Sequence, residues 1–308
     1  MPSVELGSGM HKLLELSFSE PLDQVLSLYL KWSEDTLKWK EKYLHAEDLA
    51  KLKECHDKAV PMWEAYFRTY CGGGLKPATL QVLKTEHKFI LELESVYVPG
   101  VIDQIALIEN PWYKSDAPSA VLPGSPEILA VLDYKTTSLE LETYYKSMLK
   151  SAQGPIYLKW ARSASFAEDF PDIAAKYGRP EAVMVDMIST PAIRQKKTET
   201  WPQFLDRYRE ELLSDPSSSF VRRVFQPTEA NIRGTLQGFE MDAQDCDRYF
   251  HAGHWPKNDK NCLDISGKIC EYSDECDGET ECCGVAPPSR NQLVQLKEIN
   301  GAQDTADE

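Results

Sequence analysis

The sequence predicts an α/β fold in which a mixed central sheet is flanked by helices. Apolar runs at 101–108, 127–132 and 181–189 are typical of buried strands. Segments with helical spacing of apolar residues flank and separate them, at 21–70, 139–164 and 201–213. The 308 residues are 42% hydrophobic, which is ample for a sizeable core. Strand and helix signals that alternate along the chain favour a sheet covered by helices.

Composition and charge narrow the functional classes. No run of about 18 apolar residues occurs, and no basic segment followed by an apolar one opens the sequence, so we expect a cytoplasmic protein that does not enter a membrane. The formal charge of −15 argues against broad, non-specific coating of nucleic acid. It leaves room for a local basic groove beside an acidic site, because a metal ion supplies positive charge there.

The first helix is predicted to begin almost at the start of the sequence, within VELGSGMHKLLELSF. Gly7, His11 and Glu15 recur every four residues, which stacks them along one face of the helix. A lone histidine on a helix is usually a surface or core residue. The motifs further along the chain favour His11 as a metal ligand, with Glu15 as a weaker neighbour.

Residues 21–70 have helical periodicity, and Pro61 is expected to break or kink the helix. The aromatic residues of this segment could stack on bases, but at helical spacing we expect them in the core. The lysines could contact phosphates, but acidic residues among them favour a mixed, solvated face. The aromatic residues are Trp32, Trp39, Trp63 and Tyr66, and the lysines are Lys38, Lys40, Lys42, Lys51 and Lys53.

An acid interrupts the strand predicted at 101–108. Pro99-Gly100 is typical of a turn, and Asp103 stands where an aliphatic residue is expected. Before it, residues 80–94 alternate like a strand that leads into the same hairpin. Glu86 on that strand is a candidate outer acid of a site, although an exposed strand residue is the plainer interpretation.

A second apolar strand ends in Asp133-Tyr134-Lys135. Because side chains alternate along a strand, Asp133 and Lys135 share one face and Tyr134 lies on the other. A buried carboxylate costs several kcal/mol unless a cation or hydrogen bonds offset it. Two carboxylates beside a lysine suit Mg²⁺ or Mn²⁺, and a metal-bound water beside an ammonium group is a hydrolytic arrangement.

Gln153 and Tyr157 stand four residues apart in a helical segment, which places them on one face. Gly154-Pro155 interrupts this spacing, because proline removes a helical hydrogen bond. Either the helix kinks there, or a new helix starts with Pro155 in its first turn.

After the strand at 181–189, the sequence predicts a return strand with basic residues, an amphipathic helix at 201–213, a short strand and a long helix that starts near Thr228. The basic residues of this region form a candidate phosphate-binding patch, and solvated edge-strand charge is the alternative. The candidates are Arg194, Lys196, Lys197, Arg222 and Arg223.

Six of the eight cysteines lie between Cys246 and Cys283, in a polar, turn-rich segment. This spacing predicts a structure held by metal, with Cys262, Cys270 and Cys276 as ligands. Zinc and an iron-sulfur cluster are both compatible with it. The fallback ligands are Cys71, Cys246, Cys282 and Cys283. The tail at 284–308 is predicted to be disordered and acidic, and could fold on a protein partner.

The ordered set Gly100-x-x-Asp103, Asp133-x-Lys135 and Gln153-x-x-x-Tyr157 resembles the RecB-like branch of the PD-(D/E)xK nuclease superfamily. The resemblance implies a restriction-endonuclease-like core in which Asp103, Asp133 and the backbone carbonyl of Tyr134 bind Mg²⁺ or Mn²⁺. It implies that His11 reaches the same metal and that Lys135 orients the attacking water. It also implies that Gln153 and Tyr157 shape the site and contact nucleic acid.

The C-terminal cysteines resemble those of the CRISPR-associated and phage-borne four-cysteine exonucleases, which hold a [4Fe-4S] cluster with three late cysteines and one early one. In that family the early cysteine precedes the histidine motif. The present sequence has no cysteine before His11. Either an upstream segment is absent from this sequence or the cluster is lost.

The sequence thus predicts four parts: an N-terminal helical portion at 1–79, a nuclease core at 80–245, a cysteine-rich C-terminal lobe at 246–283 and a disordered acidic tail at 284–308. The expected function is metal-dependent cleavage of DNA, by an exonuclease of repair, recombination or defence. One alternative is a non-catalytic nucleic-acid-binding or scaffolding subunit that keeps the fold. Another is an interaction protein held together by the late cysteines.

Overall fold

A computed structural model describes residues 2–71, 80–113 and 125–252 of the chain. A five-stranded sheet has the order β1-β2-β3-β4-β5. Strands β3 and β4 pair in parallel and the other neighbours are antiparallel, which confirms the predicted mixed sheet. The strands are β1 (Leu80–Glu92), β2 (Tyr97–Glu109), β3 (Glu127–Thr137), β4 (Ala182–Ser189) and β5 (Phe220–Phe225).

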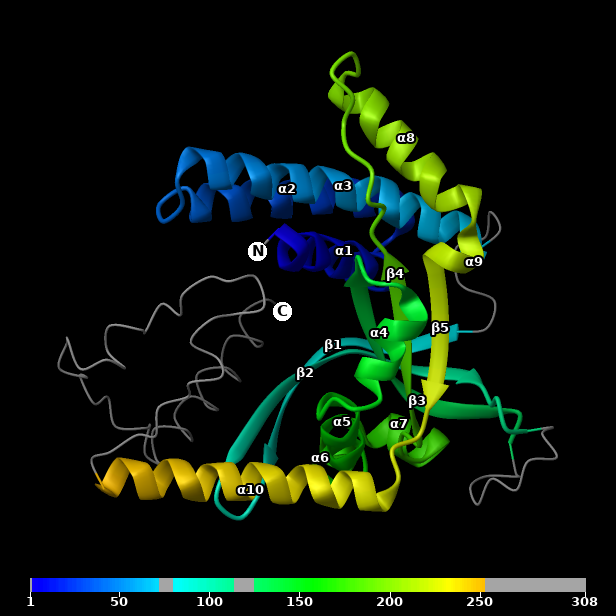
Figure 1. The fold of residues 1–308 in the computed structure, drawn as a ribbon. Coiled ribbons are helices and arrows are strands. Elements are labelled where there is room, and N and C mark those ends of the chain that lie inside the picture. Colours follow the sequence, from blue (N-terminus) through cyan, green and yellow to red (C-terminus); the bar gives the residue numbers. More distant parts are fainter. Residues whose placement is uncertain (1, 72–79, 114–124, 253–308) are drawn as a thin grey trace. The chain divides into compact units, whose positions relative to one another are not determined.

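Helices cover both faces of this sheet (Figure 1). In the described part of the chain, three long helices precede the sheet, four short ones connect β3 to β4, two connect β4 to β5, and one follows β5. They are α1 (Pro2–Ser19), α2 (Leu22–Lys40), α3 (Ala46–Cys71), α4 (Leu141–Met148), α5 (Gln153–Ala161), α6 (Ala164–Asp169), α7 (Pro171–Tyr177), α8 (Trp201–Ser214), α9 (Pro216–Ser219) and α10 (Glu229–Ala252).

The alternation of side chains along β3 separates two hydrophobic cores. Leu132 and Tyr134 point into a core shared with α1, α3 and α8. Leu129 and Val131 point to the opposite face, where α5 and α6 pack. Because β3 is apolar on both faces, it lies in the middle of the sheet, as a near-continuous apolar run predicts.

Proline and glycine residues behave differently from the sequence prediction at two places. Helix α3 continues through Pro61, so this proline does not end the helix. Pro99 and Gly100 do not form a turn but lie inside β2, where Gly100 pairs with Phe89. A Cβ atom at Gly100 would overlap the Phe89 ring, so the glycine lets the aromatic ring cover the strand.

Most of the N-terminal aromatic residues are in the core, as predicted. Tyr66 is fully buried, and Trp32 and Trp63 pack partly buried against the same core. Trp39 is the exception, because 57% of its surface is exposed. The prediction that all four aromatic residues are structural is therefore wrong for Trp39.

The predicted return strand after β4 is absent from the described residues, because 190–200 form loop and turn. Strand β4 already pairs with β3 and β5, so it offers no free edge to another strand. The loop is held instead by Glu199, which accepts two hydrogen bonds from Arg207, each 2.8 Å long, and one from the Lys196 amide.

The compact unit that carries the sheet ends at Gln244, within α10. The predicted ligands Cys262, Cys270 and Cys276, the fallback residues Cys282 and Cys283, and the predicted disordered tail lie outside the described residues. Cys246 lies on α10 and is exposed. Of the described helices, none is both long enough and apolar enough to cross a membrane.

Candidate active site

Three acidic residues lie side by side across the first three strands. In the β1–β2 ladder Thr85 pairs with Gln104 and His87 with Ile102, which places Glu86 across from Asp103. The β2–β3 ladder ends at the pair Gln104 and Leu132, and the next position places Asp103 across from Asp133. The structure therefore brings the two strand acids side by side. Glu86 extends the row, but its side chain is exposed, as the plainer interpretation of the sequence predicts.

Asp103 is tied to the backbone of the neighbouring strand. Its Oδ2 accepts a 2.7 Å hydrogen bond from the amide of Tyr134. Only 9% of the surface of Asp103 and 2% of the surface of Asp133 are exposed. The carboxylate of Asp103 is thus fixed in direction by a donor that cannot move without β3.

His11 comes to the same place from α1. Its Nε2 lies 2.7 Å from the carbonyl oxygen of Tyr134, and its Nδ1 lies 3.4 Å from Oδ1 of Asp103. Burial lowers the pKa of His11, but the hydrogen bond and the negative charge of Asp103 outweigh burial and raise it overall. Gly7, one turn earlier, lets α1 approach the sheet, because a Cβ atom there would lie 3.0 Å from Oγ1 of Thr136.

Lys135 and two residues of α5 converge on Asp133. The Lys135 Nζ lies 2.8 Å from Oδ1 and 2.7 Å from Oδ2 of Asp133. Gln153 Nε2 donates to Oδ1 at 3.2 Å, and the hydroxyl of Tyr157 lies 3.5 Å from the same oxygen. This hydroxyl donates at 2.8 Å to the carbonyl of Val101, which ties α5 to β2.

Helix α5 begins at Gln153, so the second of the two expectations for Gly154-Pro155 is confirmed. Pro155 lies in the first helical turn, where its missing N–H leaves no helical bond unmade. Gln153 Nε2 lies 2.5 Å from the Tyr157 hydroxyl, which confirms the shared face. The break between α4 and α5 therefore serves to aim the first residue of α5 at Asp133.

Both carboxyl groups next to Asp103 hold protons more tightly than usual. Burial and the charge of Asp103 raise the pKa of Asp133 to about 6, although Lys135 opposes the shift. Although Glu86 is exposed to solvent, partial desolvation of its carboxyl group and the charges of Asp103 and Glu15 raise the pKa of Glu86 to about 7. Such shifts are typical of acids crowded together at functional sites.

The side chain of Tyr134 anchors the site from the opposite face of the sheet. Its hydroxyl donates to Oε1 of Gln104 at 2.9 Å. Beside it, the hydroxyl of Tyr66 donates to the fully buried Asp186 at 2.5 Å, and Arg222 donates to Asp186 at 2.8 Å. Since Tyr134 N and O contact Asp103 and His11, this buried network holds the backbone on which the site depends.

Arg222 is therefore a structural residue, and the predicted phosphate-binding patch is wrong in part. The Arg222 guanidinium pairs with Asp186 and stacks 3.6 Å from the ring centroid of Tyr70. Arg223 points to the other face of β5, as alternation requires, and lies 3.9 Å from Glu142. Because Arg222 and Arg223 point to opposite faces of β5, the five predicted residues cannot all lie on one surface.

The site offers oxygen and nitrogen donors of the kind that a hard divalent cation takes. Among the described residues, however, no group of three or more His, Cys, Asp or Glu side chains is placed to hold a metal ion as it stands, and Lys135 contacts both oxygens of Asp133. His11 Nε2 and the carbonyl of Tyr134 are hydrogen-bond partners 2.7 Å apart, so both groups lie beside Asp103. Asp103, Asp133 and Glu86 supply the carboxylate oxygens that Mg²⁺ and Mn²⁺ prefer.

Comparisons with known proteins do not assign the chain to a family: no family model matches it, and the search of curated proteins found no match. The chemistry of the site is therefore inferred from its own geometry.

Proposed function

We propose that this chain is a metal-dependent DNA nuclease that hydrolyses phosphodiester bonds as an exonuclease of repair, recombination or defence. The observation that carries the proposal is the convergence of Asp103, Asp133 and Lys135 where the pairing of β2 with β3 ends, with His11 on the carbonyl of Tyr134. Nearly buried carboxylates cost several kcal/mol each, and packing gives no reason to retain them.

The proposed core is restriction-endonuclease-like, of the RecB-like PD-(D/E)xK type. Its support is the order of the motifs in space. The first acid lies on β2, the acid and lysine lie on β3, and Gln153 and Tyr157 lie on the helix that points back to them.

The residues fit to hold the metal are Asp103, Asp133, His11 and the carbonyl of Tyr134, with Glu86 beside them. When bound, Mg²⁺ or Mn²⁺ would lower the pKa of a water molecule and offset charge on the phosphate. Lys135 places its ammonium group beside Asp133, where it can orient that water and stabilise the negative charge that develops on phosphate oxygens. Gln153 and Tyr157 hold Asp133 and restrict its rotation.

The test is to incubate end-labelled single-stranded and double-stranded DNA with the purified chain in Mn²⁺. The wild type is compared with Lys135→Ala, Asp133→Asn and the control Lys159→Ala, an exposed lysine on α5. We expect cleavage by the wild type and the control, with a loss of about a hundredfold or more in the two site variants. Equal cleavage by all four proteins would assign the activity to a contaminant and reject the proposal. Binding of DNA without cleavage would favour the non-catalytic subunit.

We also propose that Cys262, Cys270 and Cys276 hold a [4Fe-4S] cluster or Zn²⁺. Their support is spacing in the sequence alone. A visible spectrum after anaerobic purification separates the two, because an iron-sulfur protein is brown and a zinc protein is colourless. Metal analysis that finds neither would reject both.

A further inference from the structure

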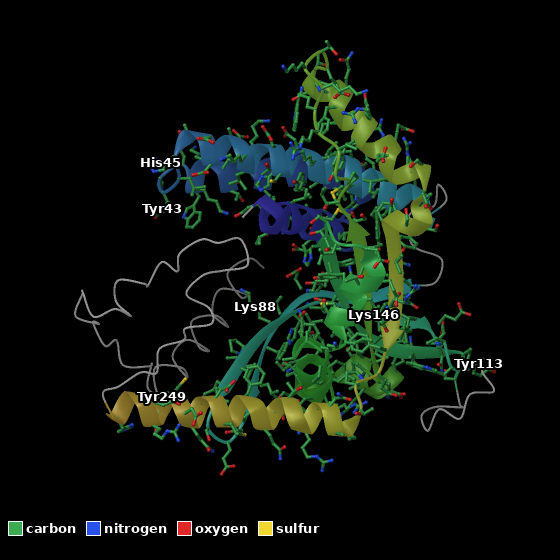
Figure 2. The ribbon with its side chains drawn as sticks, in the orientation of Figure 1. Tyr43, His45, Lys88, Tyr113, Lys146 and Tyr249 are labelled. Carbon is green, nitrogen blue, oxygen red and sulfur yellow. The ribbon has the colours of Figure 1, made fainter. Side chains whose placement is uncertain are left out.

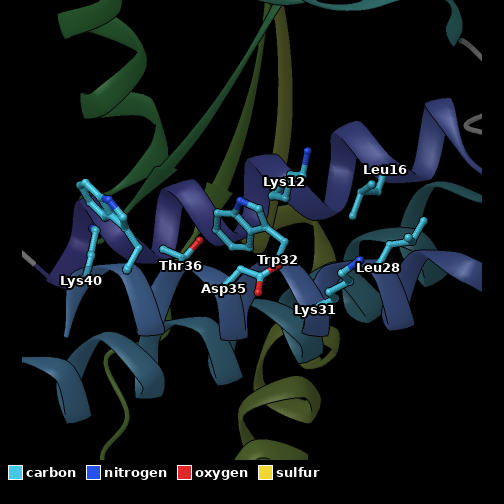
Figure 3. A pocket seen from close by; sticks show the side chains of 9 residues that line it. Lys12, Leu16, Leu28, Lys31, Trp32, Asp35, Thr36 and Lys40 are labelled. Atoms are coloured by element: carbon cyan, nitrogen blue, oxygen red, sulfur yellow. The ribbon is translucent and has the colours of Figure 1, made fainter. Parts of the chain in front are cut away.

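A groove runs between α1 and α2 (Figure 3). It holds about 530 Å³. Lys12 and Leu16 come from α1, and the other lining residues come from α2. The α2 residues follow helical spacing, so they form one continuous stripe: Leu28, Lys31, Trp32, Asp35, Thr36, Trp39 and Lys40.

The floor of the groove is apolar and rigid. Trp32 stacks on Tyr29 with ring centroids 5.6 Å apart and lies 5.0 Å from the ring of His56. His56 is in turn fixed by Ser33, whose Oγ lies 2.8 Å from Nδ1. Trp32 is thus held from below and offers its remaining surface to the groove.

One end of the groove presents unsupported aromatic surface. Trp39 is 57% exposed and Tyr43, one turn later, is 70% exposed, with their ring centroids 5.3 Å apart. Figure 2 shows Tyr43 at the turn that joins α2 to α3. Neither ring is buried in the core, so packing does not account for an aromatic residue at either position. Flat, exposed aromatic rings are the surfaces on which unpaired bases stack.

Lysines surround these rings, in a chain whose formal charge is −15. Lys31, Lys38 and Lys42 are exposed and form no ion pair with the described residues. Lys12 pairs with Glu15 at 2.7 Å and Lys40 with Glu5 at 2.5 Å, and each ammonium keeps further N–H donors for a phosphate. The segment KWKEKY at 38–43 therefore combines three cations and two aromatic rings with one acid.

Lys12 connects the groove to the candidate active site. It follows His11 on α1, and its positive charge lowers the pKa of Glu86 in the row of acids. Lys12 lies between the Leu28 and Lys40 ends of the groove, so a polyanion along the groove would pass the lysine that follows His11 (Figure 3). From Leu28 to Lys40 the stripe on α2 is about 18 Å long, which spans several phosphates of an extended strand.

We propose that the groove between α1 and α2 binds a single strand of DNA and leads it to the site formed by Asp103, Asp133 and Lys135. The inference rests on the proposed function and adds the substrate form, a single strand with unpaired bases. Trp39 and Tyr43 stack on bases, and Lys31, Lys38 and Lys42 contact phosphates. A paired duplex offers no exposed base faces to these rings and binds less tightly.

The test measures binding and cleavage separately. Fluorescence anisotropy of a labelled single-stranded thymidine oligomer, without metal, is recorded for the full chain, Trp39→Ala and Lys31→Glu. Leu30→Ala is the control for Trp39, because Leu30 is 55% exposed and lies two and a half turns away, on the opposite face of α2. Lys159→Glu is the control for Lys31, since it makes the same charge change on α5. Melting temperatures establish that each variant is folded.

We expect each groove variant to weaken binding by about tenfold and Lys31→Glu also to reduce the salt dependence, with both controls near the wild type. In Mn²⁺, the groove variants should lose cleavage of the oligomer at low concentration and keep cleavage of the p-nitrophenyl phosphodiester of thymidine, which is too short to occupy the groove. Binding unchanged in Trp39→Ala and Lys31→Glu would overturn the groove proposal, whether or not DNA is cleaved. If the wild type self-associates and Trp39→Ala does not, while both bind DNA equally, the groove is a protein interface instead. No cleavage of either substrate by any protein would reject the nuclease while the binding result still decides the groove.

Discussion

Glu86 on β1 lies directly across from Asp103 on β2, and its backbone has a φ of 43°. Few residues other than glycine adopt this left-handed conformation, and strain of this kind is often kept at functional sites. The position brings a third carboxyl group to the two that the sequence indicates. It also raises the pKa of Glu86 to about 7.

Glu86→Gln is expected to stabilise the metal-free protein and weaken metal binding. The folded protein binds this proton more tightly than the unfolded chain, so the ionised carboxylate lowers stability as pH rises from 4.5 through about 7. Because Glu86 is exposed and solvent screens its charge, the variant should unfold at only a slightly higher temperature than wild type at pH values above 7, with the difference vanishing at acidic pH. Its affinity for Mn²⁺ should fall by about tenfold. Unchanged affinity in a calorimetric titration would remove Glu86 from the site.

Binding of Mn²⁺ is expected to weaken as pH falls. Burial and Asp103 raise the pKa of Asp133 to about 6, and the pKa of Glu86 is about 7. Because a metal needs these groups without their protons, it competes with protons across this range. Calorimetry in buffers of different ionisation enthalpy should detect proton release at acidic pH that declines above pH 7. An affinity independent of pH between 5 and 8 would contradict the assigned ligands.

Tyr157→Phe is expected to reduce activity more than stability. The change removes the hydroxyl that donates to Val101 and contacts Gln153, so α5 no longer holds Asp133 firmly. Loss of one such hydrogen bond costs about 1 kcal/mol. We expect a drop of about tenfold in kcat with little change in Mn²⁺ affinity. Tyr145→Phe, which alters a tyrosine of α4 outside the site, is the control, and equal effects of the two changes would argue against a positioning role.

Arg222→Met is expected to destabilise the protein strongly. It leaves the fully buried Asp186 without its cation, and breaking a buried pair costs about 3 to 5 kcal/mol. Asp186→Leu combined with Arg222→Met should recover most of this loss, because no buried charge remains. Urea denaturation of the two variants measures both values. If the double variant were no more stable than Arg222→Met, the buried pair would not explain the loss.

The sequence predicts much of the site because its acids interrupt apolar patterns. Asp103 and Asp133 stand in runs that otherwise read as buried strands, and the alternation along β3 separates Lys135 from Tyr134 as observed. The site depends on a register between β2 and β3, and the apolar residues on either side fix that register.

Other features depend on geometry that no local pattern contains. The place of Glu86 follows from a positive φ beside a register shift in β1, which residue types alone do not indicate. Arg222 contacts Asp186 only because β4 pairs with β5, and the sequence does not show that pairing. The sequence therefore predicts Arg222 as a cation that is free to bind phosphate. Trp39 shares helical spacing with the buried aromatics, so spacing alone does not distinguish its exposed ring from theirs.

The central claim is that Asp103 and Asp133 hold one metal ion together. Crystals soaked in Mn²⁺ test it directly through anomalous scattering. The account predicts a peak within about 2.1 to 2.2 Å of an oxygen of each carboxylate and of the Tyr134 carbonyl. A peak that contacts neither carboxylate, or none at a saturating concentration of Mn²⁺, would contradict it.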